Sequence, residues 1–108
     1  MVANIEEIND GNFKQLVLDA PNLVLVDFNA QWCGPCRKLA PVLEQIQNEF
    51  LQDIKIVKMD VDKNTATPKE YGVATLPALL IFKEGEVKEF MVGMLSKSAI
   101  TSNIKKYL

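Results

Sequence analysis

The chain has 108 residues, of which 48% are apolar and 24% are charged, which fits one globular domain over residues 1–108 and excludes a disordered chain. Its net charge of −2 is spread over interspersed acidic and basic residues, which excludes nucleic acids and anionic membrane surfaces as partners. No apolar run approaches the length of a membrane span. The start of the chain has no signal segment, and two cysteines are too few for a secreted scaffold held by disulfides, so we expect a cytoplasmic protein.

The first two predicted elements are a short helix and a central strand. Asn9 or Asp10 can cap the helix, and Pro21 closes off the segment that follows it. The face that this helix would bury consists of Phe13, Leu16 and Val17. Residues 23–28 are apolar on both alternating faces apart from Asp27, which predicts a strand that is covered on both sides and lies centrally in a sheet.

A long helix, a second strand and a short helix are predicted next. The long helix covers residues 34–51, and Pro41 is expected to kink it. Its apolar stripe at the 3.6-residue period consists of Cys36, Leu39, Ala40, Leu43, Ile46 and Phe50. Residues 54–61 form a β-branched run that predicts a strand, and a short polar helix then ends at Tyr71 with Gly72 as its C-cap. The order of strand, helix and strand indicates a parallel unit.

The last part of the chain predicts a hairpin followed by a helix. Residues 78–83 and 87–92 are expected to be antiparallel strands because Gly85 supplies a turn between them. Ser96 can cap the final helix. The apolar face of that helix consists of Ile100, Ile104, Tyr107 and Leu108. We therefore expect an α/β fold with one central mixed sheet, built from a β-α-β unit and a β-β-α unit and flanked by helices on both faces.

The only two cysteines, Cys33 and Cys36, are three positions apart in the segment Cys-Gly-Pro-Cys. A zinc or iron–sulfur site needs about four soft ligands, and this chain has no histidine, so no metal site is expected. A structural disulfide that closes so short a loop contributes only about 2 kcal/mol to stability. Residues at this spacing are neighbours on a helix surface, so the pair can form and break a disulfide with little backbone movement. The spacing favours redox chemistry, and two inert buried thiols are the alternative.

The two cysteines are expected to differ in role. Cys33 lies at the N-terminus of the long helix, where unpaired N–H groups and the helix dipole favour negative charge. Its thiol is therefore expected to ionise more readily than a free one and to act as the nucleophile. Cys36 lies one turn further along the buried stripe, which predicts that it is the resolving cysteine. Pro35 suits the first helical turn, and Gly34 keeps the approach to the sulfur open.

Two charged residues interrupt strands that are otherwise mostly apolar. Asp27 and Lys58 each share the alternation of apolar residues that precede them on their strands, so both can face covered surface. A carboxyl group that is desolvated in such a place has a raised pKa. The alternative is that each side chain curls toward solvent at the end of its strand.

Within this order of elements, the segment "VDFNAQWCGPCRKLAP" resembles the thioredoxin family, and the resemblance covers essentially all 108 residues. The residues that carry it are Asp27, Trp32, Cys33, Gly34, Pro35, Cys36, Pro41, Lys58, Tyr71, Gly72, Thr75, Leu76, Pro77, Gly85 and Gly93. It implies the thioredoxin fold and a protein-disulfide reductant that acts on disulfide-containing client proteins. It further implies no bound cofactor, since electrons from NADPH arrive through a thioredoxin reductase, and we expect a monomer.

The resemblance also implies a mechanism. The Cys33 thiolate attacks a disulfide of a partner protein to give a mixed disulfide, and Cys36 then attacks Cys33 and releases the reduced partner. Asp27 acts as the base for the proton of Cys36 through a water molecule, and Lys58 modulates Asp27. These roles belong to the family and are carried over to the matching positions.

A docking surface for the partner is implied as well. It consists of Trp32, Gly34, Pro35, Leu76, Pro77 and Gly93. In the family the proline at Pro77 is cis and packs beside the cysteines, which leaves the backbone of Leu76 free to pair with an extended segment of the substrate. From the pattern alone, a trans turn at Pro77 is the default, and Trp32 could be a core residue.

The chain departs from the family pattern at Asn29, Leu76, Ala78 and Met94. The family usually has an aromatic residue at the position of Asn29, so the redox potential, the solvation of Asp27 and the choice of partner stay open. Two other functions remain: an oxidase or isomerase of the same fold, and a binding module without turnover. The oxidising relatives typically have a histidine between the cysteines, whereas this chain has glycine and proline there.

Overall fold

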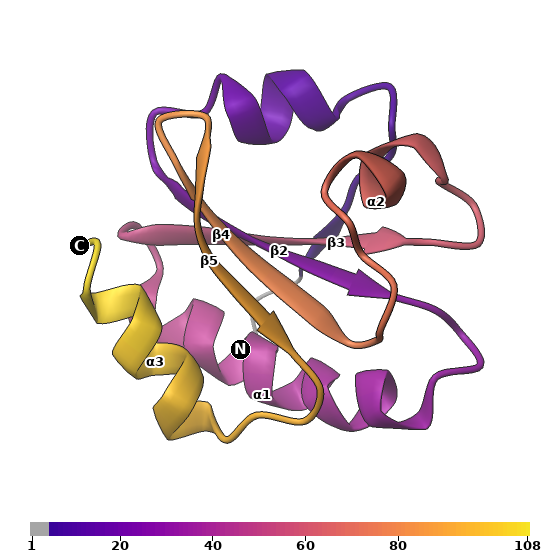
Figure 1. Cartoon of the computed structure of the whole chain (residues 1–108). Coiled ribbons are helices and arrows are strands. Elements are labelled where there is room, and N and C mark those ends of the chain that lie inside the picture. Colours follow the sequence, from indigo (N-terminus) through magenta and orange to yellow (C-terminus); the bar gives the residue numbers. More distant parts are fainter. Residues whose placement is uncertain (1–4) are drawn as a thin grey trace.

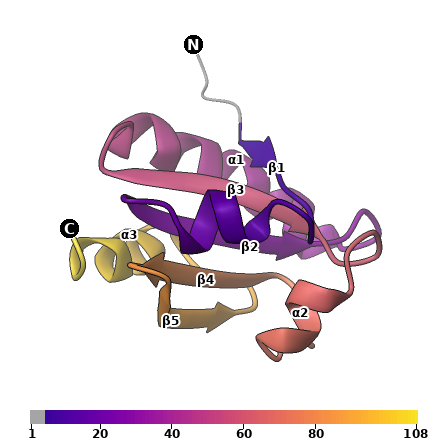
Figure 2. The same ribbon diagram turned by 90° about the horizontal axis from the view of Figure 1, so that it is seen from above.

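A computed structural model describes residues 5–108. The expectation that the chain has no signal segment rests in part on residues 1–4, which lie outside the described residues. The described chain forms one five-stranded sheet in the order β1-β3-β2-β4-β5, which can be followed from one edge to the other in Figure 2. Its strands are β1 (Glu6–Glu7), β2 (Leu23–Asn29), β3 (Ile54–Asp60), β4 (Ala78–Lys83) and β5 (Glu86–Val92). β2 is central, pairing in parallel with β3 and antiparallel with β4. The predicted mixed sheet is therefore confirmed.

Helices cover both faces of this sheet (Figure 1). The long helix α1 (Gly34–Phe50) and the last helix α3 (Lys97–Lys105) lie on one face. A five-residue π-helix, η1 (Lys14–Leu18), and the short helix α2 (Ala66–Glu70) lie on the other. α1 continues through Pro41. The architecture agrees with the prediction of one central mixed sheet flanked by helices on both faces.

The core has two apolar layers because the sheet is covered on both sides. Leu23 and Leu25 of β2 belong to the layer under α1 and α3, whereas the intervening Val24 and Val26 belong to the layer under η1. Every residue from Leu23 to Phe28 is buried. Strand β2 is therefore the covered central strand that its composition predicted, and Asp27 is its one buried charged residue.

Local sequence signals are confirmed at one helix start, one helix end and one hairpin turn. The Ser96 hydroxyl accepts a hydrogen bond from the N–H of Ala99 at 3.1 Å and caps α3. Gly72 follows the end of α2 with a φ of +70°, the left-handed conformation that terminates many helices. In the hairpin between β4 and β5, Glu84 and Gly85 both have positive φ, as a two-residue turn requires.

The prediction that Asn9 or Asp10 caps the first helix is wrong. The side chain of Asn9 accepts the N–H of Asn12 at 3.0 Å within the turn that precedes η1, and η1 itself has no side-chain cap. The Asp10 carboxylate instead accepts the N–H groups of Ala66 at 3.2 Å and Thr67 at 2.9 Å, at the start of α2. Asp10 thus caps a helix more than fifty positions away, a contact that only the tertiary fold creates.

The apolar faces of two helices also differ in part from the prediction. Ala40 is exposed on α1, and Leu108 is 57% exposed beyond the end of α3. The buried position that the pattern missed on α1 is Gln47, whose amide donates to the carbonyl of Ile54 at 2.8 Å and accepts the N–H of Ile56 at 2.6 Å. Strand β1, which was not predicted, has two residues and pairs with β3 only at Val57 and Lys58. Gln47 therefore satisfies backbone groups of β3 that β1 does not reach.

Candidate active site

The two cysteines lie where α1 begins. They form a disulfide, with their Cα atoms 5.3 Å apart. Cys33 is the N-cap of α1, in an extended backbone conformation, and its Sγ accepts the backbone N–H of Cys36 at 3.2 Å. Pro35 occupies the first turn, where its missing N–H leaves no helical hydrogen bond unmade. A Cβ at Gly34 would meet only the Nη2 atom of Arg37, at 3.9 Å. The predicted juxtaposition of two thiols at a helix N-terminus is therefore confirmed.

Burial does not distinguish the two cysteines. Cys33 is 4% exposed and Cys36 is 5% exposed. Their surroundings differ, because the Sγ of Cys33 receives a hydrogen bond from the first turn of α1, whereas Cys36 lines a cavity that it shares with Asp27. The two cysteines therefore differ in their contacts and not in their exposed area.

Asp27 is a buried carboxyl group with unequal oxygens. The residue is 4% exposed and lies on the face of β2 that packs against α1. Its Oδ2 atom accepts a hydrogen bond from the Nδ2 of Asn29 at 3.3 Å, whereas its Oδ1 atom has no hydrogen-bond partner within residues 5–108. Desolvation raises the pKa of Asp27 to about 6, while the hydrogen bond from Asn29 and the positive charge of Lys58 oppose this rise. The alternative of a carboxylate curled into solvent is therefore wrong.

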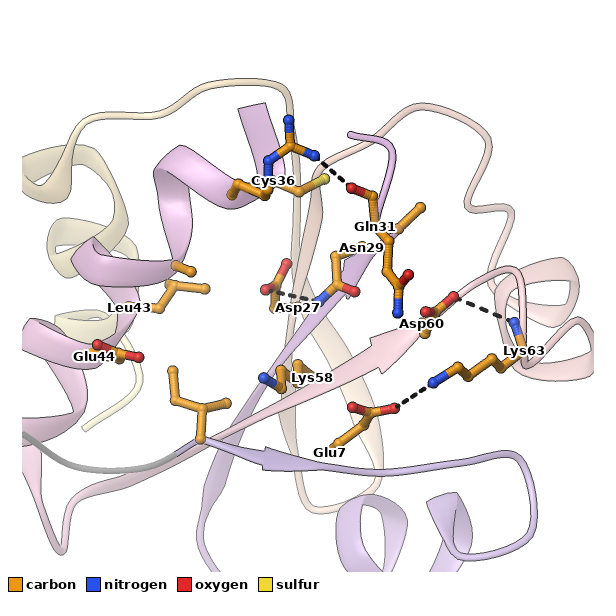
Figure 3. Close-up of a pocket in the computed structure, with 14 residues that line it drawn as sticks. Glu7, Asp27, Asn29, Gln31, Cys36, Leu43, Glu44, Lys58, Asp60 and Lys63 are labelled. Atoms are coloured by element: carbon orange, nitrogen blue, oxygen red, sulfur yellow. Dashed lines mark hydrogen bonds and ion pairs between the residues drawn. The ribbon is translucent and has the colours of Figure 1, made fainter. Parts of the chain in front are cut away.

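A cavity of about 300 Å³ connects these groups (Figure 3). It lies between α1 and the ends of β2 and β3, and Figure 3 shows Asp27 between Cys36 and Lys58. Lys58 is half-buried and stands beside Asp27 in the register of β2 and β3. The structure therefore brings together Cys36, Asp27 and Lys58, three of the residues that the sequence analysis singled out. The cavity is large enough to hold water molecules.

The predicted docking residues lie around the disulfide. Leu76 packs against Cys33 and Cys36, and the Leu76–Pro77 peptide bond is cis, as the resemblance implied. Gly93 donates its N–H to the carbonyl of Pro77 at 2.9 Å, which ties the end of β5 to this corner. The backbone of Leu76 has no hydrogen-bond partner within residues 5–108.

Trp32 is the most exposed of the large apolar residues in the described chain. Its side chain is 68% exposed, which excludes the alternative that it belongs to the core. The indole Nε1 donates to the Oδ2 atom of Asp62 at 2.9 Å. Asp62 was not singled out from the sequence, since nothing in the spacing of the two residues connects them.

Among residues 5–108, no group of three or more histidine, cysteine, aspartate or glutamate side chains is placed to hold a metal ion. None of the helices in that range is long and apolar enough to cross a membrane.

The fold and the site together define a thiol–disulfide oxidoreductase. A helix that begins at a Cys-Gly-Pro-Cys disulfide follows the central strand of a mixed sheet, and the cysteine inside the helix lines a cavity with a buried carboxyl group. This combination places a redox-active dithiol where its bond can open and close.

Comparisons with known proteins identify the family. The family model Thioredoxin matches residues 4–106. Thioredoxin of Listeria monocytogenes is 50% identical over 104 residues, which cover 96% of this chain and 99% of the relative. Thioredoxins of Synechocystis and Haemophilus influenzae are 42% and 41% identical and cover 94% and 99% of this chain, and 95% and 100% of their own lengths. The chain belongs to the thioredoxin family, and its function is the reduction of protein disulfides by dithiol–disulfide exchange.

Proposed function

We propose that Cys33 is the nucleophile of this exchange and that Cys36 resolves it. The Cys33 thiolate attacks one sulfur of a client disulfide, and the other client sulfur leaves as a thiolate. Cys36, once deprotonated, attacks the Sγ of Cys33, which releases the second client sulfur and closes the Cys33–Cys36 disulfide. Two electrons pass to the client. The observation that carries this assignment is the hydrogen bond from the N–H of Cys36 to the Sγ of Cys33 at 3.2 Å, because the same N–H group and helix terminus stabilise a thiolate at Cys33.

Asp27 is the base for the proton of Cys36, and a water molecule in the cavity relays it. A carboxyl group with a pKa of about 6 is mostly ionised near neutral pH and is basic enough to accept a proton from a thiol. The half-buried Lys58 supports the ionised form through its positive charge. The unpartnered Oδ1 atom of Asp27 in the shared cavity supports this route.

Client proteins bind over the disulfide by strand addition. An extended client segment pairs with the unpaired backbone of Leu76, while the exposed Trp32 contacts neighbouring client side chains. The rest of the docking surface consists of Gly34, Pro35, Pro77 and Gly93. Backbone pairing is independent of the client's sequence, which suits a reductant that acts on many proteins.

The oxidised protein is recycled by a thioredoxin reductase that draws electrons from NADPH. The protein works as a monomeric single domain over residues 1–108 in the cytoplasm, where disulfides are reduced rather than stored. The clients share a disulfide that an extended segment can present to Cys33.

Reduction of insulin disulfides with dithiothreitol as electron donor tests this assignment. The wild type is expected to accelerate the reaction, and Cys33→Ser is expected to abolish the acceleration. Cys36→Ser is expected to retain partners as mixed disulfides on non-reducing gels, whereas Cys33→Ser retains none. Equal recovery of partners from both variants would contradict the roles of the two cysteines. A measured redox potential separates a reductant from an oxidase of the same fold, since an oxidase has a much less negative value.

A further inference from the structure

Asn29 is the departure from the family pattern that lies beside the buried carboxyl group of Asp27. It is the last residue of β2 and lies two positions after Asp27, so both side chains point to the same face of the strand. Both residues line the cavity that Cys36 also lines. The amide of Asn29 occupies the position where the family usually has an aromatic side chain, which has no comparable amide group.

The contact between Asn29 and Asp27 involves only one carboxylate oxygen. The Nδ2 atom of Asn29 donates to Oδ2 at 3.3 Å, and Oδ1 has no partner within residues 5–108. Figure 3 shows the hydrogen bond on one side of the carboxylate and the other oxygen on the side of the cavity where Cys36 lies. A carboxylate held at one oxygen has a restricted rotation, so its free oxygen faces a constant direction.

We propose that Asn29 is a positioning residue for Asp27: its amide holds Oδ2 and thereby directs Oδ1 toward the proton that leaves Cys36. This inference rests on the proposed function of Asp27 as the base. No hydrogen bond joins the Asn29 side chain to either sulfur within residues 5–108, and Asn29 acts through Asp27.

The same hydrogen bond sets how basic Asp27 is. Donation from an amide stabilises the ionised carboxylate, which opposes the desolvation that raises the pKa of Asp27. The other charged groups that line the cavity are Glu7 from β1, Arg37 and Glu44 from α1, Lys58 and Asp60 from β3, and Lys63. Of these, only the Lys58 charge contributes to the shifted pKa of Asp27. Loss of the Asn29 donor is therefore expected to raise that pKa further.

Replacement of Asn29 by leucine, which has nearly the same shape and no donor, tests the inference. The pKa of Asp27 can be measured from the pH titration of its side-chain carboxyl carbon by NMR, in the oxidised protein, where neither cysteine titrates. Asn29→Leu is expected to raise this pKa from about 6 to about 7, since a hydrogen bond to a charged group changes the ionisation constant by about a factor of ten or more. Asn29→Ala is a second variant that removes the donor without adding apolar volume, and the same direction of change is expected.

A matched control keeps the test specific. Gln31 also lines the cavity but has no hydrogen bond to Asp27, so Gln31→Leu replaces an amide of the cavity lining by an apolar side chain without removing the donor. The pKa of Asp27 is expected to stay at about 6 in that variant. If Gln31→Leu raised it as much as Asn29→Leu does, the general polarity of the cavity rather than the amide of Asn29 would be responsible, and the inference would be overturned.

The resolving step gives the kinetic readout. Reaction of the reduced protein with a chromogenic aromatic disulfide forms a mixed disulfide on Cys33, and release of the second chromogenic thiolate in stopped flow reports the attack by Cys36. The pH at which this rate is half-maximal is expected to rise by about 1 in Asn29→Leu, in step with the pKa of Asp27. A merely structural role of Asn29 would change the rate at every pH without moving the profile.

The variant Asp27→Asn distinguishes the role of Asp27 as the base from the role of Asn29 as its positioning residue. If Asp27→Asn leaves the resolving rate and its pH profile unchanged, Asp27 is not the base and the proposed function of that residue fails. A second outcome is that Asp27→Asn slows the resolving step, whereas Asn29→Leu changes neither the pKa of Asp27 measured by NMR nor the pH profile of that step. Asp27 is then the base, and the positioning role of Asn29 is overturned.

Discussion

Burial of Asp27 makes the stability of the protein depend on pH in an unusual direction. The pKa of Asp27 rises from 3.8 to about 6 on folding, chiefly because burial removes water from the carboxylate. Between these two values the folded protein binds more protons than the unfolded chain, so this residue lowers stability as pH rises. The loss begins near the unfolded pKa of 3.8 and is complete above about 6. At about 1.4 kcal/mol for each factor of ten, the full cost is about 3 kcal/mol.

The isosteric variant Asp27→Asn removes the charge and is the test of this reasoning. Above pH 7 it is expected to be more stable than the wild type by about 2 to 3 kcal/mol, the lower figure allowing for an amide that is not fully hydrogen-bonded. Below pH 4 the two proteins are expected to have nearly equal stability. Urea unfolding followed by circular dichroism at several pH values between 3.5 and 8 measures the difference. The exposed Asp53→Asn serves as the control for loss of a carboxylate without burial.

Two results would refute this account. A gain for Asp27→Asn that is the same at pH 4 and pH 8 would mean that packing, not ionisation, is responsible. A variant less stable than the wild type at pH 8 would mean that the carboxylate is well solvated or well paired in the folded protein, contrary to its 4% exposure and unpartnered Oδ1.

Three further predictions concern contacts outside the cavity. Asp10→Ala removes the cap of α2 and is expected to lower the free energy of unfolding, measured in urea at pH 7, by about 1 kcal/mol. An unchanged midpoint of urea unfolding would mean that the cap does not contribute to stability. Gln47→Ala leaves backbone groups of β3 unpaired in the core and is expected to cost about 2 to 4 kcal/mol by the same assay, whereas a cost below about 0.5 kcal/mol would show that water replaces the amide. Trp32→Ala is expected to raise the KM for insulin about tenfold. The change in the free energy of unfolding is expected to stay below about 1 kcal/mol because the side chain is 68% exposed. An unchanged KM would exclude Trp32 from docking.

Most of the fold follows from signals that act over a few residues. The alternation in residues 23–28 predicted a strand covered on both sides, and Ser96 and Gly85 marked a helix start and a hairpin turn where the structure has them. These signals are reliable because the partners are neighbours in sequence, as when the hydroxyl of Ser96 accepts the N–H of Ala99. The start of α1 at the two cysteines was predicted for the same reason.

Elements without a local signal were missed or misread. Strand β1 is only two residues long, and both are exposed glutamates, so no apolar alternation marks it. η1 is a single π-helix of five residues rather than the expected helix capped by Asn9 or Asp10. In both cases the backbone conformation is set by packing on the sheet rather than by the propensity of its residues.

The amino-acid sequence by itself determined the order of the elements from β2 onward, the reactive pair Cys33 and Cys36, and the presence of an acidic residue on the covered central strand. Only the tertiary structure decided which groups those residues meet: Asp10 with the start of α2, Gln47 with the edge of β3, and the amide of Asn29 with one oxygen of Asp27. The physical reason is the range of the interactions. Periodicity, caps and turns are settled by groups a few positions apart, whereas a buried polar group takes whichever partner the packed layers bring within hydrogen-bonding distance.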